Sequence, residues 1–269
     1  MTVPERHTRI EDGLELPYLV WRLPAPCRMV SSAMLGGGIG PRAWILNAQV
    51  RPGYDRLDPI DHLLDLADLA ELRGDGSELR GDGSELRGDG SGLRSEGVGL
   101  LTAADVDAHV TTADAGVRLV ATVGVRVPTW AAAPDGTTDA AYPPPQACPP
   151  GTINIVAFMP RPLTDGALVN LVATATEAKT QALLDLGVPG TGTATDAVCI
   201  VSPWVSVGGN RDGGETVGDV EVDVEVDLFG GPRSVGGAAL ARAVHEAVTI
   251  GTRMSLARPE PGHSDGAWS

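Results

Sequence analysis

The spacing of apolar residues along the chain predicts a mixture of strands and helices. Short apolar runs bounded by glycine or polar residues are typical of strands, and apolar positions three or four apart are typical of helices that bury one face. The predicted strands cover residues 28–34, 43–50, 97–102, 117–127, 152–159, 197–202 and 220–229. The predicted helices cover residues 59–72, 164–186 and 235–250, with a short helical turn over 103–109. This pattern indicates one α+β domain over residues 1–269, layered, with a mixed or antiparallel sheet and packed helices.

Two stretches interrupt the pattern. Residues 71–91 contain the sequence Glu-Leu-Arg-Gly-Asp-Gly-Ser three times. Two glycines in each seven-residue copy argue against a coiled coil, and the Asp spacing of an EF-hand loop is absent. We therefore expect a low-complexity, solvated insert at 71–96. Residues 128–150 are rich in Pro, Ala and Asp and predict a flexible surface loop.

The longest predicted helix carries the one lysine of the chain, Lys179, against nineteen arginines. At about 100° per residue an apolar stripe runs along this helix, and Lys179 falls in its middle. The stripe consists of Leu168, Leu171, Val172, Ala175, Ala182, Leu183 and Leu186. Lys179 either extends along the apolar surface with its ammonium in water or is buried, and since an unpaired buried ammonium is costly, burial would require a carboxylate partner. Lys179 is then either half of a structural ion pair or a charge that serves chemistry, and the sequence leaves both open.

The ends and the other face of this helix are also readable. Thr164 or Asp165 is a plausible N-cap, and Gly187 followed by Pro189 is a stop signal. A polar stripe lies opposite the apolar one and consists of Asn170, Thr174, Glu177 and Gln181. Its spacing favours a solvated face, although such a stripe would equally line a cleft.

A loop rich in glycine and threonine, residues 190–196, leads from this helix into the strand at 197–202. Its backbone N–H groups and hydroxyls are suited to bind an anion or to stabilise an oxyanion. Thr193 or Thr195 is a candidate nucleophile if a base lies beside it. Asp196 is a candidate for that base, or for the partner of Lys179. The structural alternative is a tight turn whose threonines satisfy backbone groups.

Composition and missing motifs exclude several classes of protein. Aromatic residues make up only 4% of the chain, so Ala, Val, Leu and Ile must build the core. The net charge of −15 and the lack of a basic patch argue against a nucleic-acid partner. Residues 1–12 carry charges without an apolar core, so we expect no secretory signal, and no apolar run is long enough for membrane insertion. Three widely spaced cysteines favour a reducing cytoplasm. HExxH, GxSxG and Walker A motifs are absent, and we expect no metal site.

Several motifs together resemble one known family. The most specific are ATEAKTQAL at 175–183 and GTATDAV at 192–198. The supporting motifs are SSA at 31–33 before a triple-glycine turn, NAQV at 47–50, GLLTAA at 99–104, GTIN at 151–154, LVN at 168–170 and GGP at 230–232. Over most of its length outside the inserts and the N-terminal segment, the chain resembles the adenosylcobinamide amidohydrolases (CbiZ family) of corrinoid salvage.

The resemblance implies an enzyme that hydrolyses the amide between the corrin ring and the aminopropanol arm of adenosylcobinamide. The products are adenosylcobyric acid and aminopropanol, and no cofactor is required because the corrinoid is the substrate. The catalytic candidates are Glu177, Lys179, Thr193, Thr195 and Asp196. Glu177 or Asp196 would be the general base, Lys179 would position a carboxylate or stabilise negative charge, and the loop would supply oxyanion donors. The expected corrinoid contacts are Ser32, Gly37, Gly38, Asn47, Gln49, Asn154, Asn170, Thr176 and Gly192, with Trp44 and Trp130 as added apolar surface.

Two other functions stay open at this stage. One is a non-catalytic corrinoid-binding protein on the same scaffold. The other is a self-processing hydrolase with a threonine nucleophile, cleaved before Thr191, Thr193 or Thr195. A homo-oligomer is compatible with the sequence, which does not decide the oligomeric state.

Overall fold

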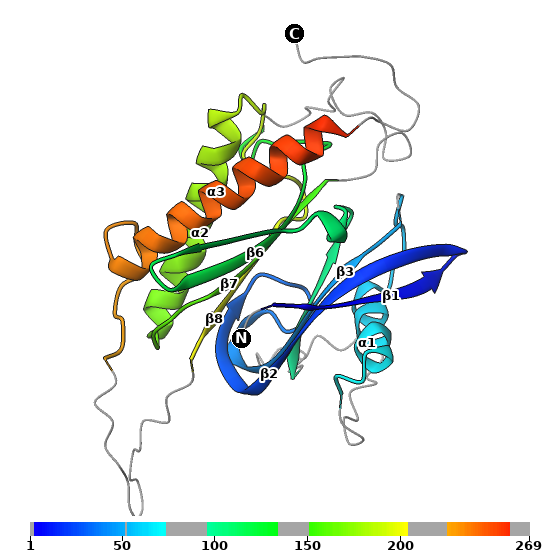
Figure 1. The fold of residues 1–269 in the computed structure, drawn as a ribbon, viewed down its shortest axis with the longest axis horizontal. Coiled ribbons are helices and arrows are strands. Elements are labelled where there is room, and N and C mark those ends of the chain that lie inside the picture. The colour runs from blue at the N-terminus through cyan, green and yellow to red at the C-terminus, as the bar shows by residue number, and fades with distance from the viewer. Residues whose placement is uncertain (1–2, 52, 74–95, 134–150, 204–224, 259–269) are drawn as a thin grey trace, which may run out of the picture.

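The computed structural model describes residues 3–51, 53–73, 96–133, 151–203 and 225–258. Within these ranges the chain forms eight strands, three α-helices and a short 3₁₀ helix (Figure 1). The strands are β1 (Glu5–Glu11), β2 (Leu14–Ser31), β3 (Gly38–Gln49), β4 (Gly97–Thr102), β5 (Val110–Asp114), β6 (Val117–Gly124), β7 (Thr152–Phe158) and β8 (Ala197–Ser202). The helices are α1 (Pro59–Leu69), η1 (Val106–Ala108), α2 (Asp165–Asp185) and α3 (Val235–Ala257).

All eight strands belong to one mixed sheet. Their order is β4-β3-β2-β8-β7-β6-β5, with β1 added beside β2. β3 and β4 pair in parallel, as do β7 and β8, and the other neighbouring strands pair antiparallel. The register of β2 on β3 shifts between Arg22 and Cys27. The first part of β2 pairs with β1 and its end pairs with β8. β2 therefore connects one half of the sheet, β1–β4, to the other, β5–β8.

The two halves enclose an apolar layer. This inter-sheet layer contains Trp21, Ile45 and Leu100 from one half, with Val120 and Val156 from the other. A second apolar cluster packs β5–β8 against α2 and α3, and a third packs β2–β4 against α1. Figure 1 shows α2 and α3 together on one side of the strands and α1 on the other. The architecture thus has four layers: α2 and α3 form the first, β5–β8 the second, β1–β4 the third and α1 the fourth.

Helix α2 follows the pattern of its sequence. Thr164 caps the N-terminus, since its Oγ1 accepts a hydrogen bond from Ala167 N at 3.2 Å. Gly187 ends the helix in the left-handed conformation, with a φ of 71°. Five residues of the apolar stripe are buried and two, Val172 and Leu186, are partly buried, and Lys179 within the stripe is only 7% exposed. The helix therefore carries its lysine into the protein rather than into solvent.

The predicted α+β fold with a mixed sheet is confirmed. β4 and β8 occupy the predicted residues 97–102 and 197–202. α2 begins and ends within a residue of the prediction, while α3 continues beyond residue 250 to Ala257. The predicted turn at 103–109 contains η1.

Three elements were not predicted: β1, β5 and the long first part of β2. β1 is mostly charged and shows no local apolar pattern, whereas the first part of β2 is apolar but carries Pro17, Pro24 and Pro26, which are rare inside strands. Their pairing depends on the partner strands instead. The predicted strand at 220–229 is wrong for residues 225–229, where only Asp227 forms an isolated bridge, to Leu163. Residues 220–224 lie outside the described residues.

Described residues of both predicted inserts contact the packed structure. Leu72 is buried in the cluster around α1, and Ala43 N donates to Glu96 O at 2.6 Å. Thr129, near the start of the predicted surface loop, forms a bridge with Gly192. The repeats at 74–95 and the rest of the loop, 134–150, lie outside the described residues.

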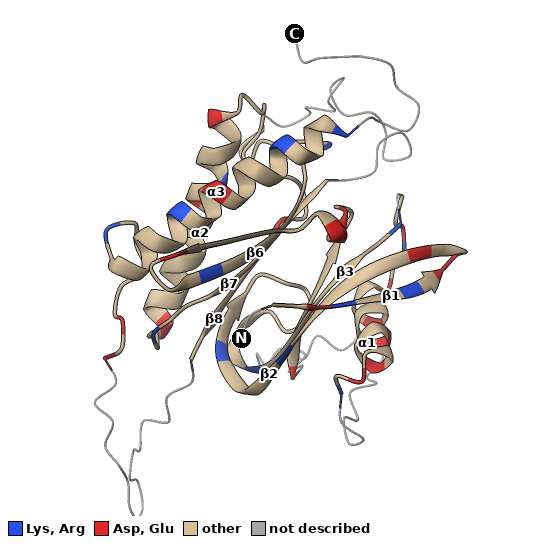
Figure 2. Ribbon diagram, in the orientation of Figure 1, with Lys and Arg blue, Asp and Glu red and all other residues tan. Residues whose placement is uncertain are grey.

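Many charges on the described surface are paired. Arg242 lies 2.6 Å from Asp114, and Arg6 lies 2.5 Å from Asp107. Figure 2 shows arginines spread singly over the elements and acidic residues along α1. Among the described helices, none is long and apolar enough to cross a membrane.

Candidate active site

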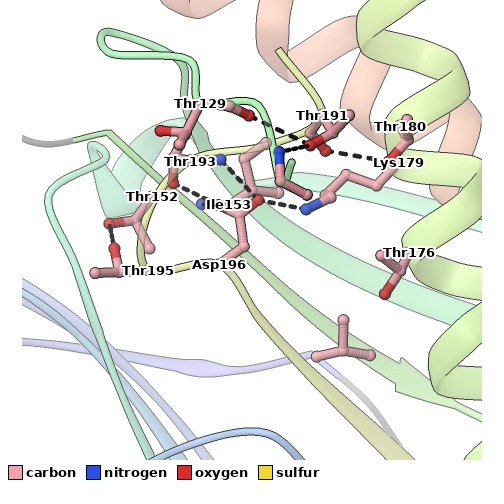
Figure 3. A network of polar contacts seen from close by, with 12 residues as sticks. Thr129, Thr152, Ile153, Thr176, Lys179, Thr180, Thr191, Thr193, Thr195 and Asp196 are labelled. Atoms are coloured by element: carbon pink, nitrogen blue, oxygen red, sulfur yellow. Dashed lines mark hydrogen bonds and ion pairs between the residues drawn. The ribbon is translucent and has the colours of Figure 1, made fainter. Parts of the chain in front are cut away.

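Lys179 and Asp196 form a buried ion pair between α2 and the loop that precedes β8 (Figure 3). Lys179 Nζ lies 2.5 Å from Asp196 Oδ2. The two side chains are 9% and 11% exposed. Asp196 is thus the carboxylate partner that burial of the lysine requires, one of the two roles expected for it from the sequence.

The Asp196 carboxylate accepts three further hydrogen bonds. Thr193 donates both from its backbone N, at 3.0 Å to Oδ2, and from its hydroxyl, at 2.5 Å to Oδ1. Ile153 N, on β7, donates to Oδ1 at 2.9 Å. Each oxygen therefore holds two donors, which favours a carboxylate that fixes the loop over one that removes a proton. The pair fastens residues 190–196 to α2 and β7.

Gly192 lies directly against the ion pair. A Cβ at this position would lie 2.3 Å from Asp196 Oδ2 and 2.4 Å from Lys179 Nζ. The residue is buried, and its carbonyl accepts from Thr129 N at 2.8 Å. Thr180 Oγ1 adds a bond to Thr191 O at 3.1 Å. Gly192 is therefore required by packing, and its burial does not favour the predicted contact with a corrinoid.

Thr195 lies on the other side of the loop. Its Oγ1 is 3.0 Å from the Oγ1 of Thr152, which is the first residue of β7 (Figure 3). Thr195 is exposed, whereas Thr152 is only 3% exposed. Alternate residues of a strand face opposite sides. Thr152 shares its side of β7 with Val156, which belongs to the inter-sheet layer. Thr195 thus marks an exposed end of that layer.

Polar residues replace apolar ones at this end of the layer. Asn154 Nδ2 donates to Asn47 Oδ1 at 2.9 Å and to Leu101 O at 2.9 Å, and Asn47 Nδ2 donates to Thr122 Oγ1 at 3.1 Å. Asn47, Asn154 and Thr122 are at most 2% exposed. Among the described residues, the buried Asn154 Oδ1 has no hydrogen-bond partner. These side chains tie the two sheet halves together, and their burial does not favour direct contact of Asn47 or Asn154 with a corrinoid.

The loop therefore has two faces. The helix face holds Lys179 and Asp196 in a closed network. The inter-sheet face presents the exposed Thr195 hydroxyl beside Thr152, at the polar end of the layer that contains Asn154. The structure brings four of the five catalytic candidates together: Thr193, Thr195 and Asp196 lie in the loop, and Lys179 forms with Asp196 the ion pair, called the brace below, that holds it.

Ser32 and Gln49 lie next to this region. Ser32 Oγ accepts from Val198 N at 3.0 Å, and Ser32 N donates to Val198 O at 3.0 Å. Ser32 thus joins the end of β2 to the start of β8, with its side chain exposed. Gln49 Oε1 accepts from Val106 N at 3.0 Å and holds η1 at the end of β3.

Gly37 lies in the turn between β2 and β3, Gly38 is the first residue of β3, and both are exposed. The two tryptophans suggested by the sequence differ in accessibility. Trp44 is 3% exposed and packs against α1, so its ring is not a surface for a ligand. Trp130 is 48% exposed.

The predicted role of Glu177 as a base does not fit its position. It lies two residues before Lys179, roughly 200° around the helix, and it is exposed. Asn170 and Thr176 are exposed on α2 as well, and Thr176 Oγ1 donates to Val172 O at 2.8 Å. Figure 3 shows Thr176 apart from the ion-pair network. The structure therefore does not bring these three residues to the loop.

Sequence reasoning did not single out Thr152 or Thr122. The signal available was a pair of polar residues, Thr152 and Asn154, that share one side of an otherwise apolar strand. Among the described residues, no group of three or more His, Cys, Asp or Glu side chains is placed to hold a metal ion.

The motifs that form this site match a known family. The model of the adenosylcobinamide amidohydrolases, CbiZ, matches residues 2–79 and 84–259. The chain belongs to this family. The match includes the ion pair, the loop at 190–196 and both asparagines of the inter-sheet layer.

One relative and two solved structures are similar to this chain. The adenosylcobinamide amidohydrolase of Halobacterium salinarum is 37% identical over 142 residues, which cover 52% of this chain and 52% of that protein. The match thus spans about half the length of that relative. Two solved structures are similar at 13% identity: the PH0078 protein of Pyrococcus horikoshii OT3, with a TM-score of 0.43 over 94% of this chain and 83% of that one, and the L-aminopeptidase D-Ala-esterase/amidase of Ochrobactrum anthropi, with a TM-score of 0.37 over 93% and 83%.

Proposed function

We propose that this protein hydrolyses the amide bond between the corrin ring and the aminopropanol arm of adenosylcobinamide. Water adds across the C–N bond, so the products are adenosylcobyric acid and aminopropanol. The observation that carries the proposal is the family match over residues 2–79 and 84–259, which includes nearly all of the described structure. The corrinoid enters as substrate, and the reaction needs no further cofactor.

The geometry of the loop supports this chemistry. Amide hydrolysis requires an attacking oxygen and donors for the oxyanion that forms on the carbonyl. Thr195 offers an exposed hydroxyl at the polar end of the inter-sheet layer. The backbone N–H groups of Ala194 and Thr195 donate to none of the described residues and are available as oxyanion donors.

The ion pair has a positioning role in this proposal. Lys179 and Asp196 do not contact the substrate but hold the loop against α2 and β7, so that Thr195 and its neighbouring N–H groups keep one geometry. A preorganised site avoids the cost of ordering the loop during the reaction. Thr193 belongs to the same brace, because both its N–H and its hydroxyl bond to Asp196.

The test is to incubate the purified full chain with adenosylcobinamide and to follow both products by mass spectrometry. Equal amounts of adenosylcobyric acid and aminopropanol support the proposal. Tight binding without product would favour a non-catalytic corrinoid-binding protein instead. Neither binding nor product would contradict the proposed substrate.

One observation favours a self-processing threonine hydrolase as a second candidate. Among the described residues, the Thr195 hydroxyl is bonded to Thr152 and to no carboxylate or imidazole. Hydrolysis of the peptide bond before Thr195 would free an α-amino group to serve as its base. The intact mass of the purified chain decides this point: a single full-length species excludes cleavage, and two fragments that begin and end at this bond establish it.

A cytoplasmic location belongs to the same proposal. It is supported by Cys27 and Cys199, which are free thiols in the described structure, as expected in a reducing compartment. Assembly into a homo-oligomer and the lack of a nucleic-acid partner stay predictions of the sequence.

A further inference from the structure

Residues 32–39, here called the 32–39 turn, include the turn between β2 and β3 and the first two residues of β3, and they carry two exposed apolar side chains. Met34 is 52% exposed and Ile39 is 38% exposed. Between them Gly37 and Gly38 are exposed and carry no side chains. Two apolar side chains thus flank a stretch of bare backbone that a flat molecule can approach closely.

This 32–39 turn is held in place from below. Arg42, only 8% exposed, donates to Gly36 O at 3.2 Å and to Gly37 O at 3.3 Å. Leu35 is 1% exposed, and its carbonyl accepts from Gly99 N at 3.1 Å. Gly36 has a φ of 70°, and a Cβ there would lie 1.9 Å from Gly97 O. The exposed apolar surface is therefore preformed, as small-molecule sites usually are.

The turn begins beside the candidate active site. Ser32 bonds to Val198 in both directions, at 3.0 Å each. β2 and β8 are antiparallel, so the residues that follow Ser32 and the residues that precede Val198 lie at the same end of this strand pair. Met34 follows the end of β2, and Thr195 precedes the start of β8. The 32–39 turn and the loop at 190–196 therefore lie at the same end of the β2–β8 pair.

We infer that the 32–39 turn binds the corrin ring of the substrate, with Met34 and Ile39 in contact with the macrocycle and Gly37 and Gly38 beneath it. This inference rests on the proposed function, which requires a broad, largely flat ligand whose reacting arm reaches Thr195. The polarisable thioether of Met34 adapts to the shape of such a ring. Burial of these two side chains by the ring would strengthen substrate binding without a part in the chemical step.

The experiment compares wild type with Met34→Ala, Ile39→Ala and the double variant. KM and kcat for adenosylcobinamide are measured separately, together with the Kd for the product adenosylcobyric acid. We expect the double variant to raise KM and Kd about tenfold or more, with kcat changed less than about twofold. Val169→Ala is the control, because Val169 is an apolar residue of α2 that is 57% exposed and lies outside the turn. It should leave all three constants unchanged.

The outcomes separate this inference from the proposed function. Wild-type hydrolysis with unchanged KM and Kd in the double variant would overturn the inference alone. A wild-type protein that neither binds nor hydrolyses the corrinoid would overturn both. Because the two side chains are half-exposed, the variants are expected to fold. A melting temperature equal to that of wild type verifies this, and Met34→Gln provides a second, shape-preserving change if the alanine variant unfolds.

Discussion

Lys179 Nζ lies 2.5 Å from Asp196 Oδ2, with both side chains about nine-tenths buried. The pair joins the middle of α2 to the loop that precedes β8. Asp196 also accepts from Thr193 and Ile153, which keep its carboxylate in place. Loss of the lysine would therefore leave a buried carboxylate without its counter-charge. The single lysine of the sequence is thus half of the brace that holds the candidate catalytic loop.

Lys179→Ala should lower the free energy of unfolding by about 3–5 kcal/mol, since it leaves Asp196 buried and unpaired. Lys179→Arg should also destabilise, because the planar guanidinium needs more room than the ammonium has beside Gly192. Denaturant unfolding of both variants provides the measurement.

Arg242→Ala is the matched control for these variants. It removes an ion pair with Asp114 in which the arginine side chain is 59% exposed, and it should leave the unfolding midpoint unchanged. Full stability and activity in Lys179→Arg would show that the position does not need a lysine.

Gly192→Ala should separate the ion pair, because the added Cβ would lie 2.3 Å from Asp196 Oδ2. We expect a loss of about 1–3 kcal/mol in stability and a matching loss of activity. Gly166→Ala is the control within α2. A Cβ there meets nothing within 4 Å, and replacement of a helical glycine should stabilise by about 0.5–1 kcal/mol. Equal stability of the two variants would contradict the packing argument.

The Lys179–Asp196 pair could be predicted from the sequence better than the polar contacts between the two sheet halves. The apolar stripe of α2 has a local period, so the position of Lys179 on the buried face followed from spacing alone, and Asp196 was a named candidate for its partner. The contact between Asn47 and Asn154 had no such signal. It depends on two sheet halves that face one another across 107 positions of sequence. β1 was missed for the same reason, since its partner rather than its own charged residues makes it a strand, while the prolines of β2 argue against a strand within an apolar run.

A second buried polar cluster lies outside the candidate site. His62, 3% exposed, lies 3.1 Å through Nε2 from Glu11 Oε2 and 2.9 Å through Nδ1 from the Tyr54 hydroxyl. Arg9 pairs with the same Glu11 oxygen at 2.6 Å. Burial is the largest influence on His62 and lowers its pKa below the ordinary 6.5, although Glu11 opposes this and Arg56 and Arg9 add to it.

Stability should therefore fall as the pH falls below about 6.5. A histidine with a lowered pKa in the folded state binds its proton more readily when the chain is unfolded. Its contribution to stability is fully present above 6.5 and is lost as the pH falls from there through the folded pKa. The urea midpoint should drop between pH 7.5 and pH 5.5 in wild type and drop less in His62→Gln. Identical pH dependence in the two proteins would rule out His62 as the cause.

Cys199 should resist alkylation in the folded protein. Burial raises the pKa of this thiol to about 12, so almost none of it is thiolate at pH 8. Iodoacetamide should leave Cys199 unmodified in the native state and label it after unfolding in guanidinium, as followed by peptide mass spectrometry. Rapid labelling of Cys199 in the native protein would contradict its burial in the inter-sheet layer.

The placement of the reaction at Thr195 is tested most directly by comparing wild type, Thr195→Ala and Thr195→Ser. The measurement is the rate at which each forms adenosylcobyric acid from adenosylcobinamide. We expect the alanine variant to fold as wild type does, because Thr195 is exposed, yet to lose about 10²-fold or more in kcat. The serine variant keeps the hydroxyl and should retain most of the activity. A Thr195→Ala protein that forms product at the wild-type rate would contradict the placement of the reaction at this loop.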